Sequence, residues 1–428
     1  MLVMQLIKYP SREFWDELLI RPAIDNKLLL KQVGKILADV QKKGDAALKR
    51  YAKKFDGVSL RKLMVDAKEL KQAEAKLTVE LKNAIDQAFE NILKFHLTQK
   101  EEVKEVEIMP GVKCWRKSIP LDRVGFYIPG GTAPLFSTVL MLGVPAMVAG
   151  SKNIVLCTPV SKEGIIHPAI LYAATKVGIK HIFKVGGAQA VAAMAYGTES
   201  IQKVSKIFGP GNQYVTAAKQ LVQLRGTAID MPAGPSEVCV IADATANPDY
   251  VAADLLSQAE HGIDSQVLLI SDSDKLIEQV NLALDAQLKA LSRKDIAQQA
   301  LKNSKAILVA NLDEAMSISN LYAPEHLIIA SDNAIAYGDQ VINAGSVFLG
   351  HYTPESAGDY ASGTNHTLPT NGHAKAYSGV SVDSFVKKVT FQQISEEGIC
   401  NLGKTVITMA EAEGLDAHAN AVKIRIKK

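Results

Sequence analysis

The chain has 428 residues, enough for about three domains of ordinary size. Hydrophobic residues make up 47% and charged residues 22%, which is the balance of a globular protein and excludes a disordered or fibrous one. The net charge of +3, from 48 basic and 45 acidic residues, shows no basic excess, so we expect no nucleic-acid partner.

Cysteine usage and the N-terminus bear on location. The four cysteines form no C-x-x-C pair and are too sparse for a disulfide scaffold, which favours the reducing cytoplasm: Cys114, Cys157, Cys239 and Cys400. The N-terminus lacks a basic segment followed by a long apolar run. The longest apolar stretch, residues 134–150, is short and interrupted by polar residues, so no membrane association is expected.

In chain order, residues 1–30 are predicted to form an arm with one short helix. Residues 31–100 have helical period and composition. The clearest helix is predicted within residues 75–96, where apolar side chains recur at three-to-four spacing: Leu81, Ile85, Phe89, Ile92 and Phe95. From about residue 123, short apolar, β-branched runs alternate with helical segments, which predicts parallel α/β sheets covered on both faces.

Three Gly-rich turns follow predicted strands: residues 127–134, 185–190 and 209–214. Each lies where a strand should end and a helix begin, and such turns offer backbone N–H groups to phosphate. Taken singly, each turn is equally well explained as an ordinary tight turn. Together they favour a nucleotide site, although none matches G-x-G-x-x-G or a P-loop.

Polar side chains with catalytic or metal-binding chemistry gather in the second half of the chain. Gln258 and His261 are three residues apart on a predicted helix, where they share a face. Glu325 and His326 are adjacent before a buried strand and offer two proton-transfer groups. Further candidates lie in an irregular Gly-rich loop or near the C-terminus: His351, Asp359, His366, Glu413 and His418. Their spacing matches no compact zinc motif, and each histidine is equally explained as a structural one.

Eight blocks in this order resemble the histidinol dehydrogenase family, and the resemblance runs from about Arg12 to Val422. The blocks are GFYIPGG, VGGAQAVAAMAYGTES, FGPGNQYVTAAK, DMPAGPSEV, LLSQAEHG, APEHL, SAGDYASGTNHTLPT and GLDAHANAV. The resemblance implies an NAD-dependent, zinc-containing enzyme that oxidises L-histidinol to L-histidine, the last step of histidine biosynthesis. It also implies the fold: two incomplete Rossmann-like, aldehyde-dehydrogenase-like domains with parallel sheets, an N-terminal arm and a small C-terminal helical tail.

The resemblance further implies roles for particular residues. One zinc ion per subunit would be held by Gln258, His261, Asp359 and His418. The same four residues would contact L-histidinol, and the pocket would be completed by Ser236, His326 and Glu413. NAD would contact Tyr127, Gln189 and Asn212, which lie in the three Gly-rich turns. His326 would act as general base in both hydride transfers, and Glu325 would activate the water that attacks bound histidinal.

We therefore predict four parts of the chain. Residues 1–30 form the arm, residues 31–125 with 237–379 form the main α/β domain that carries the metal and substrate site, residues 126–236 form the NAD-binding domain, and residues 380–428 form the tail. The tail carries Glu413 and His418, whereas the other zinc ligands come from the body. The resemblance implies a homodimer in which the tail crosses to the partner, so that active sites are shared.

Three other functions remain open from the residues alone. A zinc-dependent hydrolase of a small imidazole compound would use Glu325 and His326 but need no NAD. An aldehyde-dehydrogenase-like enzyme would need a reactive cysteine, yet Cys157 and Cys239 lie in apolar runs typical of inert, buried thiols. A non-catalytic NAD-binding protein would not need the intact set of zinc-ligand types.

Overall fold

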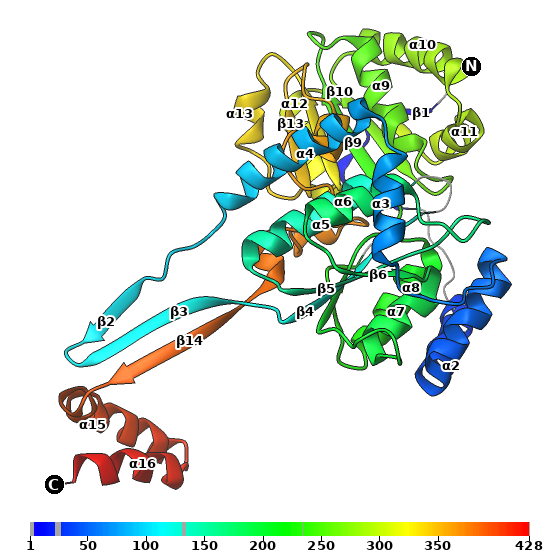
Figure 1. Ribbon diagram of the computed structural model, residues 1–428. Helices are drawn as coiled ribbons and strands as arrows, with labels where there is room; N and C mark the ends of the chain where they lie inside the picture. Colours follow the sequence, from blue (N-terminus) through cyan, green and yellow to red (C-terminus); the bar gives the residue numbers. More distant parts are fainter. Residues whose placement is uncertain (1–3, 22–26, 131–133, 233, 428) are drawn as a thin grey trace.

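The computed structural model describes residues 4–21, 27–130, 134–232 and 234–427. Residues 131–133 of the first Gly-rich turn, residue 233, and residues 1–3 and 22–26 of the arm lie outside the described residues. Two parallel sheets form the body, and a third, antiparallel sheet extends from it toward the C-terminus (Figure 1). The predicted fold class, α/β with parallel sheets, is therefore confirmed.

The first sheet has six strands, all parallel, in the order β1-β11-β10-β9-β12-β13. Their bounds are β1 (Gln5–Lys8), β11 (Lys305–Leu308), β10 (Gln266–Ser271), β9 (Glu237–Ala242), β12 (His326–Ala330) and β13 (Ser346–Leu349). The arm thus supplies an edge strand. Alternate residues of β9 face opposite layers: Val238 and Val240 pack in the core with the helices after β9 and β10, and Cys239 and Ile241 pack with Trp15 of the arm. Burial on both faces explains the continuous apolar runs.

Helices cover both faces of the six-stranded sheet. One face is covered by α9 (Pro248–Ala259), α10 (Asp274–Ala290) and α11 (Lys294–Lys302). The other is covered by α12 (Leu312–Tyr322) together with α1 (Trp15–Leu18). Two short helices follow β12 and β13, namely α13 (Ala334–Gly338) and α14 (Glu355–Tyr360). Helical turns also occur at η1 (Arg12–Phe14), η2 (Ala52–Asp56), η3 (His373–Lys375) and η4 (Val382–Phe385).

The second sheet has five parallel strands in the order β6-β5-β4-β7-β8. Their bounds are β6 (His181–Lys184), β5 (Asn153–Thr158), β4 (Arg123–Tyr127), β7 (Lys206–Phe208) and β8 (Ala228–Ile229). One face packs with α4 (Val79–Leu97), α5 (Phe136–Ala149) and α6 (Pro168–Lys176). The other packs with α2 (Lys27–Tyr51), α7 (Gly187–Tyr196) and α8 (Gln213–Gln223).

The helices between residues 27 and 97 contact this second sheet rather than the first. α2 packs on α7 and α8, α3 (Ala67–Ala75) on α6, and α4 on α5. The sequence grouped residues 31–125 with the six-stranded sheet, because strand and helix order says nothing about which sheet a preceding helix will cover. The division into domains stays a prediction, and these contacts favour moving the three helices to the five-stranded unit.

The helix α4 shows how far the apolar period predicts burial. Thr78 caps it, with the hydroxyl accepting from Leu81 N at 3.2 Å, and Ile85, Phe89 and Ile92 are buried as expected. Phe95, expected on the same face, is 43% exposed, whereas its neighbour His96 is fully buried. His96 Nδ1 lies 2.8 Å from Ile92 O, so the helix backbone satisfies one nitrogen of the imidazole that takes the place of the aromatic ring in the core.

An antiparallel ribbon carries the end of the chain away from the body (Figure 1). It consists of β2 (Glu105–Met109), β3 (Val112–Pro120) and β14 (Val386–Ile394), with Trp115 stacked on its cross-strand partner Phe391 at 5.6 Å. The predicted helical tail follows as α15 (Glu396–Ala412) and α16 (Asp416–Ile426), but the strand before it was not predicted. Among the described residues, no helix combines the length and apolar character needed to cross a membrane.

Candidate active site

Glu325 and His326 lie where the amino ends of β9 and β12 meet. His326 is the first residue of β12, and its neighbour in register on β9 is Val238. Ala323, the residue directly after α12, has a left-handed backbone with φ of 54°, and Pro324 follows. This irregular entry lets two adjacent side chains approach each other, with Glu325 Oε2 3.7 Å from His326 Nδ1.

The Glu325 carboxylate is buried and anchored. Its Oε2 atom accepts hydrogen bonds from Glu237 N at 2.9 Å and from Gln258 Nε2 at 3.3 Å. Burial raises the pKa of Glu325 to about 8, although His326 opposes this shift. A carboxyl whose pKa lies close to neutrality can exchange a proton with water under working conditions, as a general base must.

The His326 ring is held in one tautomer. Nδ1 lies 3.1 Å from Glu237 O and 3.3 Å from Gln258 Nε2. The two hydrogens of Gln258 Nε2 have the oxygens of Glu237 and Glu325 as acceptors, and a carbonyl can only accept, so we assign the proton to Nδ1. In the neutral ring Nε2 then presents its lone pair, and it has no hydrogen-bond partner among the described residues. Burial lowers the pKa of His326, but the surrounding carboxylates, Glu355 first, outweigh burial and raise it.

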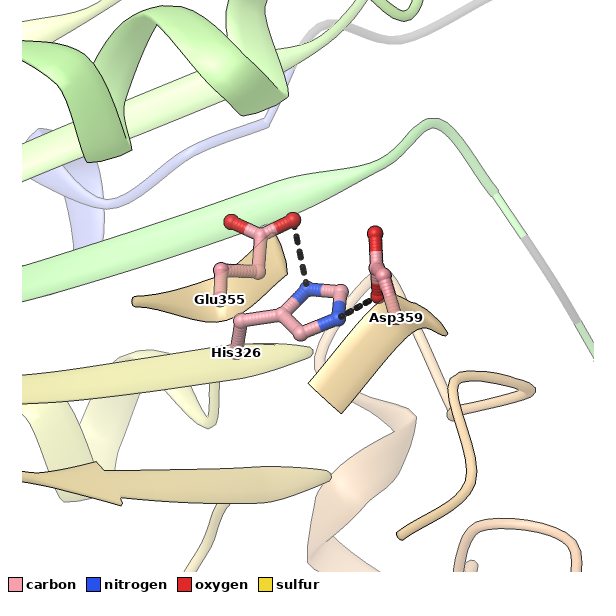
Figure 2. Close-up of side chains that lie close together, drawn as sticks. All are labelled: His326, Glu355 and Asp359. Atoms are coloured by element: carbon pink, nitrogen blue, oxygen red, sulfur yellow. Dashed lines mark ion pairs between the residues drawn. The ribbon is translucent and has the colours of Figure 1, made fainter. Parts of the chain in front are cut away.

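Glu355 is a residue of the site that the sequence analysis did not single out. It opens α14, is 1% exposed, and its Oε1 atom lies 3.9 Å from His326 Nδ1 (Figure 2). Its Oε2 atom is buried without a hydrogen-bond partner among the described residues, and burial raises the pKa of Glu355 to about 8. Glu355 and Asp359 are four residues apart, so helical spacing alone would have placed them on one face.

Asp359 approaches the other side of the same imidazole. Its Oδ1 atom is 3.7 Å from His326 Nε2, so the ring lies between two carboxylates (Figure 2). Burial raises the pKa of Asp359, but contact with His326 and the neighbouring imidazoles outweighs this and lowers it. His326, Glu355 and Asp359 offer ligand atoms within 4.8 Å of one another, a spacing suited to a metal ion. Of the four ligands implied by the resemblance, this group contains Asp359 alone.

Gln258 and His261 approach this group from α9. Gln258 is 1% exposed, and its Oε1 atom has no hydrogen-bond partner among the described residues. His261 follows the end of α9 and is exposed, yet surrounding protein lowers its pKa by desolvation. Asp359 and His326 also act on its pKa, Asp359 raising it and His326 lowering it. Ser236 lies half-buried directly before β9.

The chain does not bring Glu413 and His418 to this site. Glu413 ends α15 and His418 lies in the first turn of α16, and both side chains are exposed. These helices lie at the far end of the ribbon, away from the amino ends of β9 and β12 (Figure 1). A single chain therefore presents three of the four implied ligands near one another and carries the fourth elsewhere.

The two other histidines flagged in the Gly-rich loop differ in position. His366 is half-buried beside the site, with Nδ1 2.9 Å from Asp359 O and Nε2 3.0 Å from Thr138 Oγ1. It thereby connects α14 to α5, which belongs to the other sheet. His351 follows β13 at the opposite edge of the six-stranded sheet and pairs with Asp332 at 3.2 Å. Only His366 is placed to influence the site.

The three residues implied for NAD lie at the carboxyl edge of the five-stranded sheet. Tyr127 ends β4, Gln189 lies in the first turn of α7, and Asn212 caps α8. The Tyr127 hydroxyl accepts from Gly187 N at 3.1 Å, which joins the first two turns. Gly209 has φ of 117°, and a Cβ atom there would lie 2.0 Å from Tyr127 O, so glycine is required where the third turn meets the first.

A buried ion pair, which the sequence analysis did not predict, supports the third turn. Lys219 on α8 pairs with Asp230, and their side chains are 5% and 2% exposed. Lys219 Nζ also donates to Gly209 O at 2.9 Å, and Gly209 N donates to Asp230 Oδ2 at 2.8 Å. The pair therefore holds both the N–H and the carbonyl of Gly209, the position where the turn requires a glycine.

The cysteines do not form a reactive centre. Cys157 and Cys239 are fully buried, and burial raises the pKa of both thiols well above the ordinary value. Cys114 lies on the ribbon and Cys400 on α15, both away from the site. Because a nucleophilic cysteine needs an accessible thiolate, the cysteine-dependent alternative loses its support.

Comparison with known proteins gives one consistent result. The family model described as histidinol dehydrogenase matches residues 19–426. A histidinol dehydrogenase of Bacteroides thetaiotaomicron is 59% identical over 424 residues, covering 99% of both chains, and one of Vibrio parahaemolyticus is 54% identical, covering 98% of this chain and 97% of the relative. The crystal structure of histidinol dehydrogenase from Elizabethkingia anophelis superposes with a TM-score of 0.98 at 54% identity, covering 100% of this chain and 98% of that one.

Proposed function

Because the chain belongs to the histidinol dehydrogenase family, we propose that it oxidises L-histidinol to L-histidine through bound L-histidinal, the last step of histidine biosynthesis. The enzyme is an oxidoreductase acting on a CH–OH group. The observation that carries the proposal is the buried pair of Glu325 and His326, with Oε2 and Nδ1 3.7 Å apart. Its two groups match the two proton-transfer tasks of a four-electron oxidation.

In the first oxidation, His326 takes the proton of the substrate hydroxyl. The Nδ1–H bond to Glu237 O leaves the Nε2 lone pair as acceptor, without a competing partner among the described residues. The carbinol carbon gives up a hydride as the O–H bond breaks, so that the alcohol becomes an aldehyde. When bound, NAD supplies the acceptor for that hydride, once in each oxidation.

In the second oxidation, Glu325 takes a proton from water as the water oxygen attacks the aldehyde carbon. The resulting hydrate has a hydroxyl for His326 to deprotonate, and loss of a second hydride gives the carboxylate. Glu325 is suited to this role because burial raises its pKa to about 8 while Glu237 N and Gln258 Nε2 hold its Oε2 atom. Keeping the aldehyde bound prevents release of a reactive product.

We propose that one zinc ion per subunit is held by Gln258, His261 and Asp359 together with His418 of the partner subunit. The donors fit zinc: Gln258 Oε1 is buried without a partner among the described residues, and the shifted pKa values favour a neutral His261 and an ionised Asp359. When bound, zinc would supply a fixed point that orients the nitrogen atoms of L-histidinol. Glu355 lies close enough to compete as a ligand, but His326 would then be lost as a base.

The remaining proposed contacts are those with NAD and those that complete the substrate pocket. Tyr127, Gln189 and Asn212 would contact NAD, since their turns meet at one sheet edge. Ser236 would contact the substrate from the amino end of β9, and Glu413 of the partner subunit would do so from the tail. This arrangement makes the functional unit a homodimer with shared active sites, which agrees with a tail that leaves its own body (Figure 1).

The reaction predicts its own stoichiometry. Purified protein given a limiting amount of L-histidinol and excess NAD should produce two NADH for each histidinol consumed. The absorbance of NADH measures this yield. A zinc-dependent hydrolase would produce no NADH from any imidazole ester or amide. One NADH per histidinol, with free histidinal accumulating, would contradict the bound-aldehyde pathway.

Metal removal should inactivate the enzyme without unfolding it. We expect dialysis against a chelator to lower turnover by at least about 10-fold, because the substrate loses the fixed point that orients it. Stoichiometric zinc should restore turnover, and Asp359→Ala should resist restoration because both the metal and the activity are lost. Metal content by mass spectrometry must accompany each assay, and full turnover by a verified metal-free protein would refute the proposed role.

A further inference from the structure

The backbone of Glu237 holds three side chains of the site. Its N–H donates to Glu325 Oε2 at 2.9 Å, and its carbonyl accepts from His326 Nδ1 at 3.1 Å and from Gln258 Nε2 at 3.2 Å. Glu237 touches neither substrate nor metal in the proposed mechanism. One peptide position thus sets the orientation of both proton-transfer groups and of one proposed zinc ligand.

The side chain of Glu237 is itself held, and mainly by the N-terminal arm. Arg21 donates from Nε to Oε1 at 2.5 Å and from Nη2 to Oε2 at 2.9 Å, a two-point contact that fixes the carboxylate plane. The two side chains are 16% and 3% exposed. Asn371 N adds a hydrogen bond to Oε1 at 2.9 Å from the Gly-rich loop.

Arg21 also holds the segment that leads into Glu325. Its Nη2 atom donates to Tyr322 O at 2.8 Å, and its guanidinium lies 3.8 Å from the centre of the Tyr322 ring. Tyr322 ends α12, and Ala323 and Pro324 then connect it to Glu325. Arg21 therefore contacts both chain segments, the start of β9 and the end of α12, whose relative position sets the distance between Glu237 and Glu325.

We propose that Arg21 is a positioning residue for the reaction: through Glu237 it fixes the tautomer of His326 and the location of the Glu325 carboxylate. This inference rests on the proposed function of those two residues. A buried ion pair is often replaceable by apolar side chains with little loss of stability, so stability alone gives no strong reason for a two-point contact here. The need to orient His326 gives a stronger reason for this contact, because a small displacement of the Glu237 carbonyl would free the imidazole to rotate or change tautomer.

The test compares substitutions in the full-length, zinc-loaded enzyme. Arg21→Ala should lower kcat about 10- to 100-fold, the range for losing a group that orients a metal-site or catalytic side chain. The KM for NAD should stay unchanged, since the NAD residues lie on the other sheet. Arg12→Ala is the matched control, because Arg12 lies on the same arm, is exposed, and contacts the Trp15 ring at 5.8 Å; its kcat should equal that of wild type.

Chemical rescue separates positioning from simple folding. Free guanidinium, far below concentrations that unfold proteins, should restore part of the kcat of Arg21→Ala and leave Arg12→Ala unchanged. If Arg21→Ala fails to fold, Arg21→Lys and Glu237→Gln retain most of the volume, and the inference requires that each folds with wild-type zinc content and reduced kcat. Wild-type kcat in folded Arg21→Ala, or a loss that guanidinium does not relieve and that raises every KM, would overturn the proposal.

A measurement independent of turnover keeps the two proposals distinguishable. The nitrogen chemical shifts of histidine report which ring atom carries the proton, and His326→Asn identifies the signals of His326. In wild type they should report the Nδ1–H tautomer, and in Arg21→Ala a mixture of tautomers. Absence of histidinol turnover in wild type would reject the proposed function alone, whereas identical His326 signals in both proteins would reject the positioning role alone.

Discussion

His326→Asn is expected to slow the oxidation of both L-histidinol and L-histidinal by about 10²- to 10⁴-fold, whereas Glu325→Gln should impair mainly the oxidation of L-histidinal. Each hydride transfer requires loss of a hydroxyl proton, and the proposed acceptor is His326 Nε2, which has no hydrogen-bond partner within the described part of the chain. Water is consumed only in the second oxidation, and Glu325 is the carboxyl whose raised pKa of about 8 suits proton removal from water. The two substitutions should therefore divide the reaction into its halves.

Single-turnover measurements started separately with histidinol and histidinal give the two rates. His351→Asn is a matched control, because His351 lies after β13 at the opposite edge of the same sheet and pairs with Asp332. Its rates should equal those of wild type. Equal losses in both half-reactions for Glu325→Gln would contradict the assignment of water activation, and an unaffected first oxidation in His326→Asn would remove His326 as the base.

The sequence predicted the buried parts of the fold best. β9, β10 and β12 are apolar on both faces, and that composition alone indicates strands of a covered parallel sheet. The ribbon of β3 and β14 was missed because its residues are only partly buried, so no clear alternation marks them, and because the two strands are far apart in the chain. Pairing over such a distance is decided by the rest of the fold.

Site residues could be predicted where the residue type itself indicates the chemistry. They could not be predicted where the chemistry depends on the folded surroundings. Glu325 and His326 could be named from adjacency, and the family resemblance supplied their roles. Glu355 was not named, because a glutamate in a polar loop has no sign of its environment until burial raises its pKa. No sequence pattern indicates a role for Arg21 either, since only the folded arm brings its guanidinium to Glu237.

The position and the exposed apolar side chains of the tail favour an active site shared between two subunits. α15 contacts both α16 and β14, and the ribbon carries the two helices away from the body of their own chain (Figure 1). Met409, Leu415 and Ile424 on this tail are large apolar side chains that are 60%, 43% and 59% exposed. Apolar surface of this kind favours burial against a second copy, and exchange of a terminal element is a common route to symmetric dimers.

Two inactive variants should therefore restore activity to each other when His261→Ala and His418→Ala are unfolded and refolded together. If the tail crosses, a mixed dimer has one site with both defects and one site with neither. Random association makes half of the dimers mixed, so roughly a quarter of the wild-type activity should return from two preparations that are each inactive. If each tail serves its own body, every site carries one defect, and no activity returns. Each variant refolded alone is the control for recovery, and differently tagged chains show that mixed dimers have formed. Mixed dimers without activity would refute the shared site and would require the tail to fold back onto its own subunit.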